Sequence, residues 1–283
     1  MYGHEFKKLR KAQGISQKPV CQGICSESKL SRWENDLIEV EFSTAMKLLD
    51  RIHITSHEFM GWSKFAPDPE IDEEIQDALN SDNIPLLRRV AKKQIAKYHQ
   101  THDKRDLFIA APLCSQLIIL DHKKYLSDVD LNTLAKEFSK VTVWSEYYIS
   151  LFGSCLFILN SKQIYGISMQ ILKDIDHIRQ ANTSFDVQVV MGSLEDAVTK
   201  LISQNDLEHA QKLITALSKV ELPIYMMFFK LTLTFLKELI NYVKTDDEQP
   251  ILSLIDTLLN LNCSTQAATY LDMLKYIQHC KQE

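Results

Sequence analysis

Residues that end helices and build tight turns are scarce in this chain. Glycine and proline each occur seven times among the 283 residues, roughly 2.5% each against usual frequencies of ~7% and ~5%. We therefore predict an all-α fold, and the length predicts about two domains. The glycines are also too widely spaced for GxGxxG, GxxxxGK or GxSxG motifs. This spacing excludes the familiar nucleotide-dependent and hydrolase classes.

Charge is distributed unevenly along the chain. Residues 7–32 hold seven basic side chains and one acidic side chain, whereas residues 66–283 hold 22 basic and 29 acidic side chains. A basic segment attracts polyanions. The start of the chain is therefore predicted to meet a polyanion, and the acidic remainder a different partner.

The first 65 residues predict five short helices. Each has a boundary residue and apolar residues three or four positions apart. Thr55 and Glu58 form a capping box at the start of the fifth helix. Five short helices, with a break of three to four residues between the second and the third, are typical of a helix-turn-helix domain. The boundary residues are Gly14, Ser16, Gly23, Ser26 and Ser43, and the apolar positions are Phe6, Leu9, Val20, Leu30, Trp33, Met46, Leu49 and Ile52.

Three runs of residues in this region resemble a known family. The runs LRKAQGISQ at 9–17 and LSRWEN at 30–35 resemble the phage-repressor (XRE) type of DNA-binding domain. The run VCQGICS at 20–26 narrows the resemblance to the Rgg/GadR/MutR family of Gram-positive transcriptional regulators. The resemblance is specific over residues 4–60 and diffuse beyond. It implies a sequence-specific regulator that binds double-stranded DNA.

The third helix carries the predicted base contacts. If it enters the major groove, the exposed side chains near its N-terminus are Glu27, Ser28, Lys29 and Arg32. Arginine and lysine can donate to guanine, glutamate can accept from cytosine, and serine can do either. The alternative for Arg32 is an ordinary solvated side chain.

Phosphate contacts and one structural pair complete the predicted DNA-binding domain. The resemblance implies that Gln17 contacts a phosphate and that Arg10 and Glu34 form an ion pair. The lysines that would add attraction independent of DNA sequence are Lys8, Lys11 and Lys18, together with Lys7.

A linker and an array of helix pairs are predicted beyond this domain. Two prolines within residues 66–70 favour an extended linker, so the predicted domains are 1–65 and 71–283. Predicted helix starts near 85, 127, 161, 206 and 246 recur about every 40 residues, as in an α-solenoid of helix pairs. One pair carries two apolar stripes, and in each stripe the residues lie at offsets of 0, 3, 7, 11 and 14. The first stripe is Ile164, Ile167, Ile171, Ile175 and Ile178, and the second is Val187, Val190, Leu194, Val198 and Leu201.

The family resemblance implies a role for this array. It implies tetratricopeptide-like helix pairs that bind a short, often hydrophobic signalling peptide on their concave face and form a homodimer through the last helices. Residues 144–154 resemble a stretch that contributes to the peptide-facing wall. The candidate peptide contacts are polar, aromatic or methionine side chains beside the apolar stripes, each with ordinary core or surface packing as the alternative: Tyr148, Ser154, Met191, Met226 and Lys230.

The sequence predicts neither a metal site, nor a cofactor, nor an enzyme. The histidine pairs 53/57 and 99/102 lack the glutamate of HExxH and cysteines in zinc spacing. Cys21 and Cys25 match neither a thioredoxin motif nor a zinc finger, so we expect packed thiols, with redox sensing as the alternative. We find no catalytic set of side chains.

Two functional hypotheses follow. The first is a homodimeric regulator of an approximately palindromic operator, controlled in quorum sensing by a peptide in the concave face of the array. The second keeps the DNA-binding domain but gives the array a protein partner, or the cysteines a redox role, without a peptide. We expect a cytoplasmic protein without membrane contact, because we find no signal peptide and no long apolar span.

Overall fold

The chain is described here from a computed structural model that covers residues 2–62, 73–81, 83–176, 178 and 184–282. Most of these residues are helical and none lies in a strand, which confirms the predicted all-α class. They divide into two compact units, Met1–Asp72 and Glu73–Glu283. The predicted linker at 66–70 lies outside the described residues. In the same described ranges, no helix is both long and apolar enough to cross a membrane.

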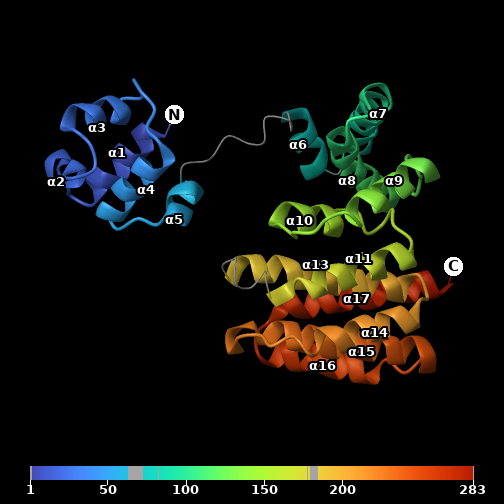
Figure 1. The fold of residues 1–283 in the computed structure, drawn as a ribbon. Helices are drawn as coiled ribbons and strands as arrows, with labels where there is room; N and C mark the ends of the chain where they lie inside the picture. The colour runs from blue at the N-terminus through green and yellow to red at the C-terminus, as the bar shows by residue number, and fades with distance from the viewer. Residues whose placement is uncertain (1, 63–72, 82, 177, 179–183, 283) are drawn as a thin grey trace. The chain divides into compact units, whose positions relative to one another are not determined.

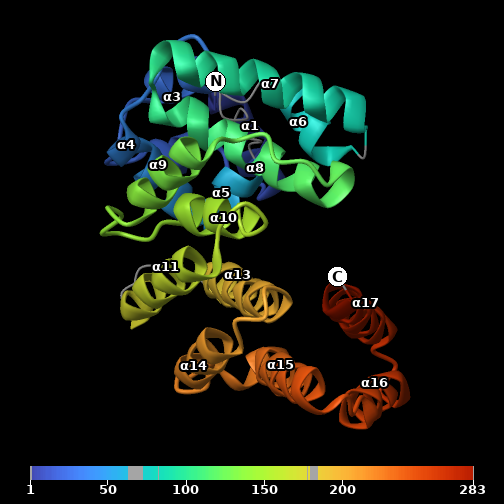
Figure 2. The same ribbon diagram turned by 90° about the vertical axis from the view of Figure 1, so that its right-hand side faces the viewer.

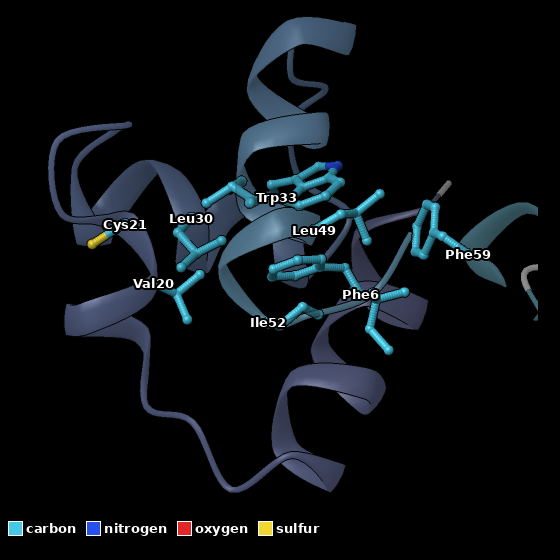
Figure 3. Close-up of a cluster of buried hydrophobic side chains, with 10 residues drawn as sticks. Phe6, Val20, Cys21, Leu30, Trp33, Leu49, Ile52 and Phe59 are labelled. Carbon is cyan, nitrogen blue, oxygen red and sulfur yellow. The ribbon is translucent and has the colours of Figure 1, made fainter. Parts of the chain in front are cut away.

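The first unit consists of five helices (Figure 1), which are α1 (Gly3–Ala12), α2 (Gln17–Cys21), α3 (Glu27–Glu34), α4 (Phe42–Arg51) and α5 (Ser56–Trp62). The apolar positions named from the sequence form its core, with Phe6, Leu30 and Ile52 fully buried. Figure 3 shows the buried members of this core, Phe6, Leu30 and Ile52 among them, converging between the helices. The ring of Phe6 lies 4.9 Å from that of Trp33, which joins α1 to α3.

The helix boundaries of this unit follow the predicted signals, with two differences. Gly14 and Gly23 have positive φ, of 68° and 74°, which suits glycine. The capping box forms, because the Thr55 amide donates to the Glu58 carboxylate at 2.8 Å and the Glu58 amide donates to the Thr55 hydroxyl at 3.2 Å. However, α4 begins at Phe42, ahead of the predicted Ser43. The break between α2 and α3 spans residues 22–26, longer than the predicted three to four residues.

The second unit is an array of helix pairs. The predicted starts near 85, 127, 161, 206 and 246 correspond to the first helices of five pairs, α7, α9, α11, α14 and α16. A single helix, α6 (Glu73–Asn80), precedes the pairs, and a short 3-10 helix, η1 (Ile224–Met226), leads into α15. The pairs are α7 (Ile84–Thr101) with α8 (Lys104–Asp121), α9 (Asp128–Phe138) with α10 (Glu146–Ser154), α11 (Ser161–Lys173) with α13 (Ser184–Ser203), α14 (Leu207–Leu217) with α15 (Met227–Thr245), and α16 (Gln249–Asn260) with α17 (Ser264–Gln282).

The two matching apolar stripes are buried, as predicted for a helical hairpin. Every member of both stripes is at most 8% exposed. The first stripe continues past the end of α11, because α11 ends at Lys173 while Ile175 and Ile178 are still buried. The two helices that carry the stripes, α11 and α13, pack against each other.

The last helix of the array returns toward an earlier pair. Figure 2 shows α13 to α17 following an arc, with α17 at its end. Although α13, α15 and α17 belong to three successive pairs, each contacts the other two, and α13 also contacts α10. Such mutual contacts require the second helices of the pairs to lie on the inside of the curve. We call the surface formed by α10, α13, α15 and α17 the inner surface.

Candidate functional site

The exposed side of α3 gathers the predicted base contacts. Glu27, Ser28, Lys29 and Arg32 are all exposed, whereas Leu30 and Trp33 on the opposite side are buried. The helix starts where the Ser26 hydroxyl accepts from the Lys29 amide at 3.2 Å. Four polar side chains therefore project from a helix that is anchored on its other side, which is the arrangement that a major groove can accept.

A buried network fixes the end of α3 against α1 and α2. Arg10 donates to both carboxylate oxygens of Glu34, from Nε at 2.6 Å and from Nη2 at 2.8 Å, and it also donates to the carbonyl oxygen of Ile15. Arg10 is 6% exposed and Glu34 is fully buried. A bidentate, buried pair of this kind sets the geometry of the helices it joins.

Gln17 belongs to the same network. It is half-buried at the start of α2, and its Nε2 donates to Glu34 at 2.8 Å. An amide nitrogen carries two donor hydrogens. The second one remains for the phosphate contact that the family resemblance implies.

The basic side chains around α3 differ in their partners. Lys8 pairs with Glu5 at 2.8 Å, and Lys7 donates to Asn35 at 2.7 Å. Lys11, Lys18 and Arg32 are exposed. The side chains of these last three make neither a hydrogen bond nor an ion pair with any described residue, so their charges face solvent.

Two residues that the sequence did not single out also hold this surface in place. A Cβ on Gly3 would lie 1.8 Å from the carbonyl oxygen of Trp33, so only glycine permits this approach of α1 to α3. Arg51 of α4 donates to the carbonyl oxygens of Pro19 and Gln22, each at 3.2 Å. It thereby ties α4 to the turn before α3. Both contacts join residues about 30 positions apart, and we find no local sequence pattern that signals them.

The five candidate peptide contacts differ in burial and in their neighbours. Met191 is fully buried and Met226 is 3% exposed, so both methionines pack into the core. The half-buried ring of Tyr148 packs edge-on against Phe108 of α8, with ring centres 6.3 Å apart. Ser154 is exposed at the end of α10, where its hydroxyl donates to a carbonyl oxygen of its own helix. Lys230 is exposed on α15.

The inner surface carries a different set of polar groups on α13. Glu195 is only 8% exposed, and burial together with the neighbouring Asp196 raises its pKa to about 9. Lys200 lies one turn further along. Its amine stands 4.5 Å from the ring centre of Phe157 and donates to the hydroxyl of Tyr276 on α17 at 3.3 Å.

Neither a reactive thiol at Cys25 nor a metal site is indicated among the described residues. Burial and the nearby Cys21 raise the pKa of the Cys25 thiol, against a smaller lowering by Lys29. A raised pKa keeps a thiol in its less reactive protonated form, which disfavours redox sensing there. A search of the described residues finds no group of three or more His, Cys, Asp or Glu that could hold a metal ion.

Comparison with known proteins places the two units in characterised families. A helix-turn-helix family model matches residues 6–59. The model described as "HTH-type transcriptional regulator Rgg, C-terminal domain" matches residues 89–272. Comparison with curated proteins gives no match.

Solved structures with the same fold cover almost the whole chain. The SHP pheromone receptor Rgg2 of Streptococcus dysgalactiae is 16% identical, with a TM-score of 0.73 over 97% of this chain and 99% of that one. A bacterial peptide pheromone/receptor complex is 14% identical, with a TM-score of 0.67 over 98% of each chain. The PrgX/cCF10 complex is also 14% identical, with a TM-score of 0.71 over 99% of this chain and 92% of the other.

Proposed function

Because the chain belongs to the Rgg family of helix-turn-helix transcriptional regulators, we propose that it is a regulator whose DNA binding is controlled by a short peptide. The families that it matches are transcriptional regulators and not enzymes. In this proposal, residues 1–65 bind the operator and residues 71–283 bind the peptide.

The DNA-binding part of the proposal rests on the exposed side of α3. Arg32 and Lys29 are exposed there, on a helix that the Arg10–Glu34 pair holds in place. Arg32 would discriminate bases by donating to guanine, with Lys29, Ser28 and Glu27 beside it. The outward-facing lysines would add attraction to any DNA sequence.

The peptide-binding half rests on the shared fold. Rgg2 is described as a pheromone receptor, and PrgX was solved in complex with cCF10. The inner surface suits an extended peptide, because successive helix pairs present a continuous wall. A peptide bound there would regulate DNA binding only if its affinity differs between the DNA-competent and the incompetent arrangement.

A homodimer completes the proposal. Leu259, Leu261 and Leu271, on or directly after the last two helices, are 49%, 66% and 36% exposed, and a partner chain could bury them together. Two copies would place two α3 helices on half-sites about one helical turn apart, or a multiple of that distance.

Fluorescence anisotropy tests the peptide half directly. Labelled synthetic peptides from small open reading frames flanking the gene are titrated with the purified full chain, with and without DNA selected from a randomised pool. We expect saturable binding of one peptide and a change in DNA affinity. If no flanking peptide binds while DNA binding is intact, the second hypothesis, a protein partner for the array, replaces this one.

A further inference from the structure

The carboxyl group of Glu195 on α13 makes no hydrogen bond or ion pair with the residues that the structure describes. Its side chain is 8% exposed, and its Oε1 is buried with no hydrogen-bond partner among the described residues. Leaving a buried polar atom unpaired costs free energy, so such an atom in a folded protein calls for an explanation. The missing partner points to a group that arrives from outside the chain.

The adjacent Asp196 shows where that group would arrive. Its side chain is solvent exposed, and it makes no hydrogen bond or ion pair with the rest of the described chain. Burial nevertheless raises its pKa. The two facts agree if Asp196 faces a recess, where water reaches the carboxyl group but surrounding protein limits its hydration. Three other helices of the inner surface, α10, α15 and α17, pack against α13.

Lys200 does not neutralise these acids. It follows Asp196 by one helical turn, a spacing at which opposite charges commonly pair. Its amine is instead held by Tyr276 at 3.3 Å and by the ring of Phe157 at 4.5 Å. The hydroxyl of Tyr276 in turn donates to Ser203 at 3.3 Å. Lys200 is thus held by its contacts with Tyr276 and Phe157, and within the described chain it does not pair with the carboxyl groups of Glu195 and Asp196.

We propose that Glu195 and Asp196 bind a cationic group of the regulatory peptide, either its N-terminal ammonium or a lysine or arginine side chain. An ammonium carries three donor hydrogens, enough to serve Glu195 Oε1 and the Asp196 carboxylate together. This inference rests on the proposed function, because it names the chemistry of the peptide that the inner surface takes.

An organic cation fits this site better than a metal ion does. Calcium takes six to eight oxygen ligands, and magnesium needs near-octahedral coordination. Two carboxyl groups fall short of either, and the described residues offer no larger acidic group. Every linear peptide with a free amino terminus, by contrast, carries an ammonium.

Three matched libraries of octapeptides built from apolar residues test the proposal. The first has free amino termini, the second is N-acetylated, and the third is N-acetylated with one lysine. The tightest binder of each library is titrated with the full wild-type chain, with the double variant Glu195→Gln/Asp196→Asn, and with Asp256→Asn as a control. Asp256 is an exposed acid on α16, outside the inner surface.

We expect the double variant to weaken binding of a cationic peptide by about 10- to 100-fold, the range for hydrogen bonds to charged groups. The acetylated peptide without lysine should bind both proteins equally, and Asp256→Asn should change nothing. A loss confined to the free amino termini identifies the N-terminal ammonium as the bound group, and a loss confined to the lysine library identifies the side chain. Both substitutions are nearly isosteric, and circular dichroism and DNA binding confirm that the variant is folded.

Two outcomes overturn the inference, and they are distinguishable. If the double variant binds cationic peptides as tightly as the wild type does, the carboxyl groups do not hold the cation, although peptide control stands. If the wild type binds no peptide of any library while it still binds DNA, peptide control itself fails, and the inference fails with it.

Discussion

Glu195 is a side chain through which pH acts on stability. Its pKa of about 9 in the folded chain lies above its ordinary value of 4.5. The folded state therefore keeps a proton that the unfolded state loses between these values, so stability falls as pH rises through this window. Asp196 beside it, whose pKa is also raised, acts in the same direction. Tyr270 of α17 is the other titratable neighbour, and its own pKa is raised.

The variant Glu195→Gln should remove most of this dependence. We expect it to be more stable than the wild type at pH 8, and the advantage should shrink by up to about 1.4 kcal/mol per pH unit on going toward pH 5.5. Urea unfolding of both proteins at the two pH values measures the difference. An advantage of the same size at both pH values would show that Glu195 is ionised in the folded chain.

We expect Arg32 to determine the base preference at one position of the operator. Because its side chain is exposed and unpaired within the described chain, Arg32→Ala should leave the stability of the first unit unchanged. Discrimination at one base pair should fall by about 1–3 kcal/mol. Competition binding against single-base variants of the selected DNA tests this expectation. An unchanged preference at every position would mean that another part of α3 faces the bases.

Lys11→Ala is the matched comparison for Arg32→Ala. A phosphate contact carries no sequence information, so its loss should weaken binding to all DNA sequences alike. It should also lower the slope of log affinity against log salt concentration by about one. The two variants together separate the recognition of bases from the attraction of the protein to the DNA backbone.

At the scale of elements, the contact between α1 and α3 depends on Gly3. The added methyl group of Gly3→Ala would overlap the Trp33 carbonyl group, whose oxygen lies 1.8 Å and carbon 2.5 Å from the new Cβ. We expect a loss of about 1–3 kcal/mol in stability of the first unit, with weaker DNA binding because α3 shifts. Gly166→Ala on α11 is the control. It has no atom within 4 Å of the new Cβ and should stabilise its helix by about 0.5–1 kcal/mol.

Helices and their buried faces could be predicted because periodicity is a local property of the sequence. The stripes from Ile164 and Val187 are buried as their spacing indicates, and most helix starts lie within a residue or two of the predicted positions. What depends on a distant neighbour could not be predicted. Met191 looks the same in the sequence whether it lines a groove or, as here, the core.

The acidic pair of α13 shows the same limit at the candidate site. In the sequence, Glu195 and Asp196 look like the solvated face of an amphipathic helix. In the folded chain Glu195 is only 8% exposed, because several helices pack against α13. Gly3 is a similar case, because its importance lies in the position of Trp33, thirty residues later.

At the scale of the whole molecule, the proposed dimer gives a further prediction. Light scattering should find the wild type as a dimer, and Leu261→Glu should shift it toward monomer, because a charge would be buried in the interface. DNA affinity should then fall, since two linked domains gain from effective concentration. Ile224→Glu is the control, because Ile224 is 91% exposed on η1, away from the last helices. A wild-type monomer at micromolar concentration would contradict the dimer.

The position of α17 in the chain has a consequence for biosynthesis. Its buried Tyr270, Leu274 and Ile277 lie on the helix that packs against α13 and α15, yet the ribosome makes α17 after both of those helices. At about 5–20 residues per second, the stretch from Ser203 to Gln282 takes roughly 4–16 seconds to emerge. During that interval the nascent chain already contains the first unit, while the inner faces of α13 and α15 are uncovered. A ribosome-bound chain could thus fold its DNA-binding part early, whereas its inner surface would stay incomplete and prone to aggregation until α17 has emerged.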